Sequence, residues 1–225
     1  MSSFTEFMIK CFCSIVKAIP LTIVLIAVPM ILGTIIGLLF ALARIKKVPL
    51  LSQFIAVYNS FFRSVPLLVL LFLGYYGLPK LLNVLVYQGN KVVGTKNLNA
   101  AAVAVAVMTL YAAAFLGEII RGAIKSVDYG QMEAGYVLGM TKRQAVTGIL
   151  IPQAFGVALP NLKNFLLSFF KGSSVVFCIG VIDIMAAAKI EAEISYRYIE
   201  AYVLVSLFYL AASILVGRIS ASASE

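Results

Sequence analysis

Histidine is absent from the 225 residues, and charged side chains make up only 12% of them. Without an imidazole, a zinc hydrolase or a Ser-His-Asp hydrolase would lack its central residue. The three cysteines, Cys11, Cys13 and Cys178, form neither a disulfide framework nor a zinc-binding pattern. The phosphate-binding pattern G-x-x-x-x-G-K-[ST] is missing as well. The sequence therefore predicts a chain with no catalytic residues, no metal site and no cofactor of its own.

Apolar residues are abundant instead. They make up 62% of the chain, and the mean hydropathy is +1.03, whereas ordinary soluble domains are about 45–50% apolar and about 25% charged. A bilayer core of ~30 Å requires about 20 mainly apolar helical residues, and several uncharged stretches reach that length. The predicted fold is an all-α integral membrane protein, with about five transmembrane helices in one membrane domain over residues 1–225. The expected spans are 18–43, 64–82, 98–122, 153–182 and 198–217.

Prolines and polar residues interrupt two of these spans. Pro66 predicts a kink at the start of the second span, and Pro79 is expected to end it. Pro152 and Pro160 predict breaks in the fourth span, which also carries several polar residues. Because such residues are tolerated at membrane depth only where protein or water surrounds them, the fourth span is expected inside the helix bundle. Residues 183–197 are expected to form a mixed-charge loop after it.

The distribution of positive charge predicts the topology. Basic residues cluster between apolar runs, which is typical of a membrane protein and not of a nucleic-acid-binding surface. If the C-terminal tail is cytoplasmic, the N-terminus and the connection 83–99 are external. The inside segments then hold nine basic residues: Arg44, Lys46, Lys47, Arg63, Arg121, Lys125, Lys142, Arg143 and Arg218. The outside segments hold seven: Lys10, Lys17, Lys80, Lys91, Lys96, Lys189 and Arg197. The positive-inside rule thus favours this orientation by a small margin.

Between the third and fourth spans, residues 123–152 are too polar for lipid but are patterned as helices. Asp128 with Gln131 three residues later is an N-cap signal, and Gly139 suits the left-handed residue that ends a helix. Thr141 and Gln144 repeat the capping-box spacing directly afterwards. The sequence therefore predicts two short helices that form an elbow at the membrane surface.

The elbow also carries a family resemblance. Residues 133–139 read E-A-G-Y-V-L-G and are followed, after nine residues, by I-L-I-P at 149–152. This run resembles the EAA loop of ABC-importer permease subunits, whose pattern is E-A-A, three residues, G, nine residues, I-x-L-P. Residues 62–69, F-R-S-V-P-L-L-V, resemble the F-R-G-T-P-L-L-V segment of polar-amino-acid permeases. Further matches are Tyr111, Glu118, Arg121, Gly122, Gly130, Gln131, Met132, Pro152, Gln153, Ala154, Pro160 and 171–174.

The resemblance covers roughly residues 20–218 and has two departures. Gly135 stands where the family usually has its second alanine, and Gly172 stands where an acidic or amide residue is common. The first substitution is conservative in size. The second removes a polar side chain at that position, so the resemblance does not assign the substrate contacts there.

The resemblance implies a transmembrane permease subunit of an ATP-driven importer of polar amino acids that works by alternating access. Glu133, Ala134, Gly135 and Gly139 would form a cytoplasmic coupling helix that receives force from a separate ABC ATPase dimer, where ATP and Mg²⁺ bind. Other implied partners are a second permease copy or a sister permease, an extracytoplasmic substrate-binding protein and the lipid bilayer. The location implied is the bacterial inner or plasma membrane, and the substrate could be cystine, glutamine or a basic amino acid.

Polar residues within the spans are further candidates. Lys171, Ser173 and Ser174 lie at a predicted helix break, where they could bind an amino-acid carboxylate or simply pack within the bundle. Glu118 and Arg121, three residues apart, are expected to pair as a structural feature. Asp183 and Glu200 are expected near the outer mouth. Two other functions stay open at this point, an ion-coupled secondary transporter and a non-transporting docking protein.

Overall fold

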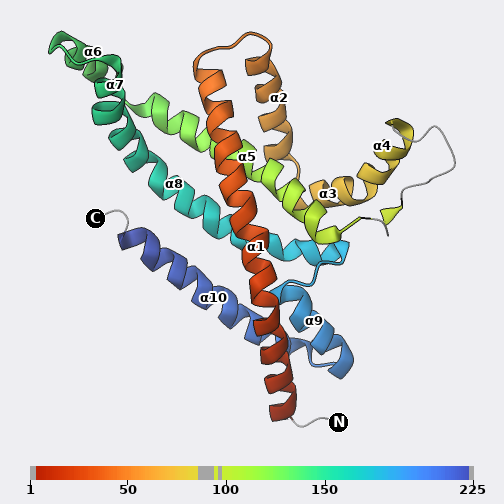
Figure 1. Cartoon of the computed structure of the whole chain (residues 1–225). Helices are drawn as coiled ribbons and strands as arrows, with labels where there is room; N and C mark the ends of the chain where they lie inside the picture. The colour runs from red at the N-terminus through yellow and green to blue at the C-terminus, as the bar shows by residue number, and fades with distance from the viewer. Residues whose placement is uncertain (1–3, 86–93, 96–97, 223–225) are drawn as a thin grey trace.

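A computed structural model of the chain describes residues 4–85, 94–95 and 98–222, and the regular elements among them are all helical (Figure 1). Five helical segments are long and apolar enough to cross a membrane. They are Phe4–Ile45, Leu67–Val84, Ala100–Ser126, Lys142–Ile179 and Tyr198–Leu215. The predicted all-α membrane class with five spans is confirmed. Most of the expected external connection 83–99, including Lys91 and Lys96, lies outside the described residues.

The first span lies within a longer helix than expected. Helix α1 (Phe4–Ile45) has 42 residues and begins well before residue 18. At 1.5 Å per residue it is about 63 Å long, roughly twice the thickness of a bilayer core. Pro20 and Pro29 lie inside it without ending it. Its N-terminal half packs against α9 (Ile184–Ser195) and α10 (Tyr198–Ser222) around Cys11, Ile15 and Ala188.

The second span is preceded by the predicted break at Pro66. Helix α2 (Leu51–Ser64) ends where Val65 and Pro66 take extended conformations, and α3 (Leu67–Phe72) follows. A π-helical turn, η1 (Leu73–Gly77), leads into α4 (Leu78–Leu85). The expectation that Pro79 ends the span is wrong, because the helix continues to Leu85. The π turn ends two residues before Pro79. Proline has no backbone N–H for the regular α-helical hydrogen bond, and the wider turn accommodates this loss.

The fourth span also has a π-helical turn before a proline. After α6 (Tyr129–Val137) and α7 (Lys142–Ala145), the π-helical turn η3 (Val146–Leu150) precedes Pro152. Helix α8 (Ile151–Gly172) then runs through Pro160 without interruption. The predicted breaks at the two prolines are therefore wrong. The regular α-helix ends at Gly172, where a 3-10 segment, η4 (Ser173–Ile179), begins.

Two further expectations about this region need correction. The expected loop 183–197 is mostly helix α9, because the Asp183 side chain caps its first turn by accepting a hydrogen bond from the Ala186 N–H at 2.8 Å. The fourth span is also not enclosed by the rest of the chain. Only Ala154, Ala158, Phe165 and Phe169 of α8 are buried, so one face is covered by this chain and the other is open.

Helices α1 and α5 (Ala100–Ser126) form the central pair of the fold, and α8 packs on α5 from the other side. Small residues bring α1 and α5 into backbone contact. A Cβ on Gly37 would lie 2.7 Å from the backbone nitrogen of Gly117, and one on Gly33 would lie 2.7 Å from the Cβ of Ala112. The small-residue pair Gly33 and Gly37 is thus the place where α1 meets α5.

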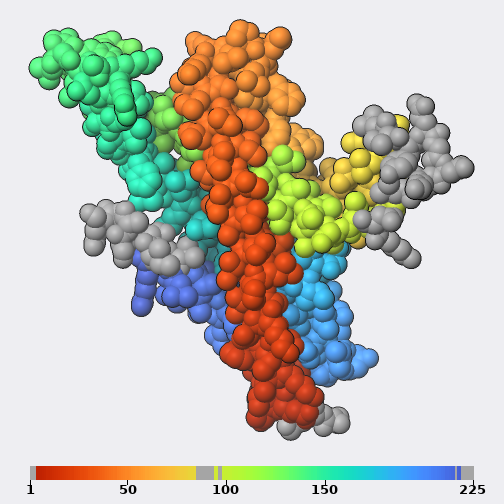
Figure 2. Space-filling model, in the orientation of Figure 1, coloured from red at the N-terminus to blue at the C-terminus, as the bar shows by residue number. Residues whose placement is uncertain are grey.

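The elbow α6–α7 lies at the same end of the molecule as the turn between α1 and α2, and the N-terminus and α9 lie at the opposite end (Figure 1). The space-filling view shows α6–α7 standing out from the body of the chain (Figure 2). The elbow end carries Lys46, Lys47, Lys142 and Arg143. The positive-inside rule favours this end as the cytoplasmic one.

We expect Gly37→Ala to destabilise the membrane domain by about 1–3 kcal/mol, because the new methyl group overlaps the backbone of α5. The thermal midpoint of the purified protein in detergent should fall. Gly122→Ala is the matched control, since a Cβ at Gly122 meets nothing within 4 Å. An equal midpoint for both variants would contradict the close approach of α1 and α5.

Candidate functional site

The elbow begins directly at the end of the third span. Helix α5 ends at Ser126, Val127 is extended, and Asp128 caps α6 by accepting a hydrogen bond from the Gly130 N–H at 2.9 Å. This confirms the predicted N-cap. Gln131 does not reciprocate as a capping box would, because its side-chain oxygen accepts a hydrogen bond from the Gln153 amide of α8. Helix α6 is thus tied to both spans that flank it.

The end of α6 is defined by glycine. Gly139 has φ +82°, as predicted for a left-handed terminating residue. The Met140 N–H donates to the Gly135 carbonyl at 3.0 Å and closes the last turn. Thr141 then caps α7 with the full capping box predicted from its spacing to Gln144. Two capped helices at an angle therefore form a defined elbow.

The four predicted coupling residues differ in exposure, three of them lying on α6 and Gly139 just after its end. Glu133, Ala134 and Gly139 are exposed, whereas Gly135 is buried. A Cβ on Gly135 would lie 2.9 Å from Cδ1 of Ile149 and 3.2 Å from the sulfur of Met140. Gly135 therefore lets α6 pack against the start of the fourth span, while the other three residues face outward.

Two apolar residues on the outer face of the elbow were not anticipated. Val137 and Leu138 are 86% and 81% exposed at the end of α6. They stand next to Glu133 and Ala134 in the last turns of a helix that projects from the molecule. The sequence signal for both residues is their position directly before Gly139, at the end of a helix that the Asp128 cap begins.

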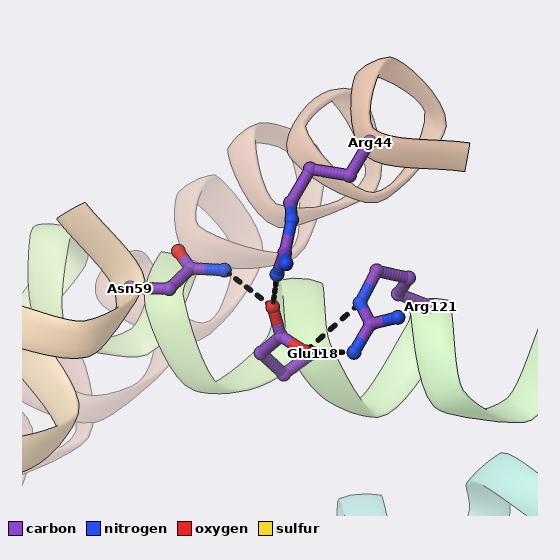
Figure 3. A network of polar contacts seen from close by, with 4 residues as sticks. All are labelled: Arg44, Asn59, Glu118 and Arg121. Atoms are coloured by element: carbon purple, nitrogen blue, oxygen red, sulfur yellow. Dashed lines mark hydrogen bonds and ion pairs between the residues drawn. The ribbon is translucent and has the colours of Figure 1, made fainter. Parts of the chain in front are cut away.

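A cluster of ionic contacts joins three helices near the elbow (Figure 3). Both carboxylate oxygens of Glu118 are used. One accepts from the Arg121 Nε at 2.9 Å and Nη2 at 2.6 Å, which confirms the expected pair within α5. The other accepts from the Arg44 guanidinium of α1 and from the Asn59 Nδ2 of α2 at 2.8 Å. Arg44 and Asn59 are far from Glu118 in sequence, and no local spacing indicates them.

The structure brings Lys171 and Ser174 together but places Ser173 elsewhere. Lys171 and Ser174 line a cavity of about 270 Å³ between the end of α8 and α10. Ser173 is buried, and its hydroxyl donates to the Phe170 carbonyl at 2.8 Å. The remaining lining residues are Met185, Tyr202, Val205, Ser206 and Tyr209. This cavity therefore combines an ammonium group with hydroxyl groups of serine and tyrosine.

A second cavity lies on the other side of α8 and was missed by sequence reasoning. It has about 310 Å³ and is lined by Leu67, Tyr111, Phe115, Ile119, Asn164, Phe165, Ser168, Phe169 and Gly172. The guanidinium carbon of Arg63 lies 5.5 Å from the centre of the Phe115 ring. Gly172 thus borders this aromatic cavity and not the one that contains Lys171.

The expectation that Asp183 lies near an outer mouth is wrong, because its side chain is fully buried. One carboxylate oxygen caps α9, and the other has no hydrogen-bond partner in the described part of the chain. Burial raises the pKa of this carboxyl to about 6. Glu200 makes a long contact of 4.0 Å with Arg197 at the start of α10. Asp183 is therefore a structural residue of the α9 terminus.

Five helices long and apolar enough to cross a membrane, a capped elbow that projects from them, and a polar and an aromatic cavity beside α8 define a multi-pass membrane transport component. A family model described as binding-protein-dependent transport system inner membrane component matches residues 33–224. The chain belongs to this family and is a multi-pass protein of the bacterial inner membrane. Membership favours an importer component over the secondary transporter and the docking protein that the sequence left open.

Several relatives agree with this assignment. The probable amino-acid ABC transporter permease protein PatM of Vibrio harveyi is 40% identical over 190 residues, which cover 84% of this chain and 81% of PatM. The probable amino-acid permease protein YxeN of Bacillus subtilis strain 168 is 39% identical, covering 93% of this chain and 89% of YxeN. The L-cystine transport system permease protein TcyL of the same organism is 36% identical, with 88% and 80% covered.

Solved structures show the same fold. A chain in the crystal structure of an amino acid ABC transporter with histidines superposes with a TM-score of 0.84 at 28% identity, covering 100% of this chain and 99% of that one. A chain of the inward-facing MetNI methionine ABC transporter superposes with a TM-score of 0.70 at 19% identity, covering 100% and 98%. The second likeness concerns the fold alone.

We expect Gly139→Val to loosen the elbow, because a β-branched residue at positive φ is strained by roughly 1–3 kcal/mol. Hydrogen exchange of the α6 and α7 amides should become faster, while the membrane helices stay protected. Gly148→Val is the control, since neither position has an atom within 4 Å of a new Cβ and only Gly139 has positive φ. Equal exchange in the two variants would mean that the Gly139 backbone conformation does not stabilise the elbow.

Proposed function

We propose that this chain is the permease subunit of an ATP-driven importer of polar amino acids, and that it forms part of the translocation pathway by alternating access. The observation that carries the proposal is the capped elbow α6–α7, which projects from the membrane domain on two spans and has the spacing of the EAA loop. The names of PatM, YxeN and TcyL support amino acids as the substrate class.

Energy for transport comes from a separate ABC ATPase dimer, which binds ATP and Mg²⁺. Glu133, Ala134 and Gly139 on the outer face of the elbow contact this ATPase, and Gly135 seats α6 on the membrane domain. Closure of the ATPase dimer displaces α6. Because α6 is joined to α5 through two residues and to α8 through the Gln131–Gln153 hydrogen bond, both spans move with it.

A second permease copy or a sister permease completes the pathway. The face of α8 that this chain leaves open supports this arrangement. The family description, binding-protein-dependent transport, supports an extracytoplasmic binding protein as the partner that delivers substrate.

The cavity of Lys171 and Ser174 is the proposed substrate site. The Lys171 ammonium pairs with the α-carboxylate of an amino acid, and hydroxyl groups of Ser174 and Tyr202 supply hydrogen bonds. The Ser173 hydroxyl donates to the Phe170 carbonyl and lies outside the cavity lining, so Ser173 is assigned no ligand contact. A cavity of about 270 Å³ suits a small ligand such as one amino acid.

We expect Ser174→Ala to raise the KM for amino-acid uptake by about tenfold or more, because a hydrogen bond to a charged ligand contributes roughly 1.5–3 kcal/mol. Uptake into proteoliposomes that contain the full transporter measures this. Ser173→Ala is the control, since Ser173 is buried and does not line the cavity, and its KM should stay near that of the wild type. Unchanged KM in Ser174→Ala and Lys171→Gln would remove this cavity from the proposal.

We also expect Glu133→Lys to abolish binding of the ATPase subunit without unfolding the membrane domain, because it reverses the charge on the exposed face of α6. Copurification of the two subunits measures this directly. The control is Glu193→Lys, an equal charge reversal on exposed α9 at the opposite end of the molecule. Full copurification of the ATPase with Glu133→Lys would contradict the assignment of α6 as the coupling helix.

A further inference from the structure

The Glu118 cluster occupies a mechanically sensitive position on α5. Glu118 lies about two helical turns before the end of α5 at Ser126, and α6 begins at Tyr129. A displacement of α6 therefore reaches Glu118 through the two linking residues and the last two turns of α5. Beyond Gly117, α5 separates from the seam with α1 and is buried again only at Ala123, which packs against Ala154 and Ala158 of α8.

The α1–α5 seam, where Gly33 and Gly37 face residues 112–117, brings the two helices close together but contains no hydrogen bond or ion pair between the two helices at these residues in the described structure. It is built from glycine and alanine, and the Cβ of Ala112 and backbone atoms of Ala113 and Gly117 face Gly33 and Gly37. Van der Waals contacts between such small residues are individually weak and have no preferred direction. One directional contact lies earlier, where the Tyr58 hydroxyl of α2 donates to the Leu110 carbonyl at 2.7 Å. The contacts that join α5 to both α1 and α2 lie one residue after Gly117, where Glu118 meets Arg44 and Asn59.

The contacts of Glu118 divide into two kinds. One oxygen accepts from both α1 and α2, so three helices converge on a single atom (Figure 3). The other oxygen accepts only from Arg121, which belongs to α5 itself. Arg44 and Asn59 can therefore fix α5 against its neighbours, and Arg121 cannot.

The surroundings make these contacts costly to break. The Glu118 side chain is 13% exposed, and those of Arg44 and Arg121 are 24% and 23% exposed. If α5 moves away from α1, Glu118 keeps Arg121, but Arg44 loses its ion pair with Glu118 and becomes a partly shielded, uncompensated charge. The cluster therefore favours one register of α5 relative to α1 and α2.

We propose that Glu118 is a positioning residue for energy coupling, whose carboxylate locks α5 to α1 and α2 so that the three helices move as one body when α6 is displaced. The inference rests on the proposed function, because it assumes that the ATPase acts on α6. It assigns to Arg44 and Asn59 a role that depends on Glu118, and to Arg121 a smaller role within α5.

The two arginines offer a matched pair of variants. Arg44→Met removes the partner on another helix, and Arg121→Met removes the partner on the same helix, from side chains of nearly equal exposure. In the complete transporter in proteoliposomes, the ratio of amino acid imported to ATP hydrolysed is measured. We expect Arg44→Met and Glu118→Gln to lower this ratio at least tenfold, and Arg121→Met to lower it less than threefold.

The charge swap Arg44→Glu with Glu118→Arg tests whether the contact itself matters. It retains one carboxylate between two guanidiniums but places the carboxylate on α1. We expect the swap to restore the transport ratio to within about threefold of the wild type. Equal effects of Arg44→Met and Arg121→Met, or an unchanged ratio in both Arg44→Met and Glu118→Gln, would overturn the inference.

Glu133→Lys separates this inference from the proposed function. If Glu133→Lys abolishes ATPase binding while Arg44→Met transports normally, the positioning role fails and the coupling helix stands. If Glu133→Lys transports normally, the proposed function fails first. If Glu118→Gln does not reach the membrane, Arg44→Met and the charge swap still test the positioning role. Each of them keeps a guanidinium–carboxylate pair in the cluster and is therefore expected to insert.

Discussion

The backbone contact between α1 and α5 is the constraint on which the rest of the structure depends. Lipid provides no hydrophobic force that would drive one apolar helix against another, so the association relies on close packing and on polar contacts. Gly37 and Gly117 allow the two backbones to touch, and the ionic cluster at Glu118 follows directly on the same side of α5. The helix that carries the elbow is thereby fixed to the longest helix of the molecule.

Rigidity at the elbow has a different physical source. Helices α6 and α7 have 9 and 4 residues, lengths at which isolated helices are unstable in water. Asp128, Gly139 and the capping box of Thr141 satisfy the terminal backbone groups that water would otherwise compete for. Gly135 adds tertiary contact with the start of the fourth span. A projecting element of this kind can transmit a push, which an unstructured loop cannot do.

The features that could be predicted from the sequence are those determined by residues close together in the chain. The caps at Asp128 and Thr141, the positive φ of Gly139 and the ion pair of Glu118 with Arg121 all depend on spacings of a few residues. Span number followed from apolar length for the same reason.

The features that sequence reasoning missed depend on tertiary context. Pro79 and Pro152 do not end their helices, because a π turn precedes each of them, and that turn leaves no composition signal. Ser173 and Ser174 are neighbours in sequence, yet they differ in burial, because successive side chains of a helical segment point in different directions and only that of Ser173 meets the packed interior. Arg44 and Asn59 join Glu118 only after three helices have packed.

The end of α8 connects these observations. Its last turn and the following 3-10 segment separate the two cavities, so that Lys171 and Ser174 face one and Gly172 faces the other. At its opposite end α8 is tied to α6 through Gln153. The helix continues through Pro160 as one rigid element between these ends. In the proposed mechanism, displacement of the elbow is transmitted to both cavities through this one helix. The geometry thus offers a single helical connection between the elbow and the two cavities within the membrane domain.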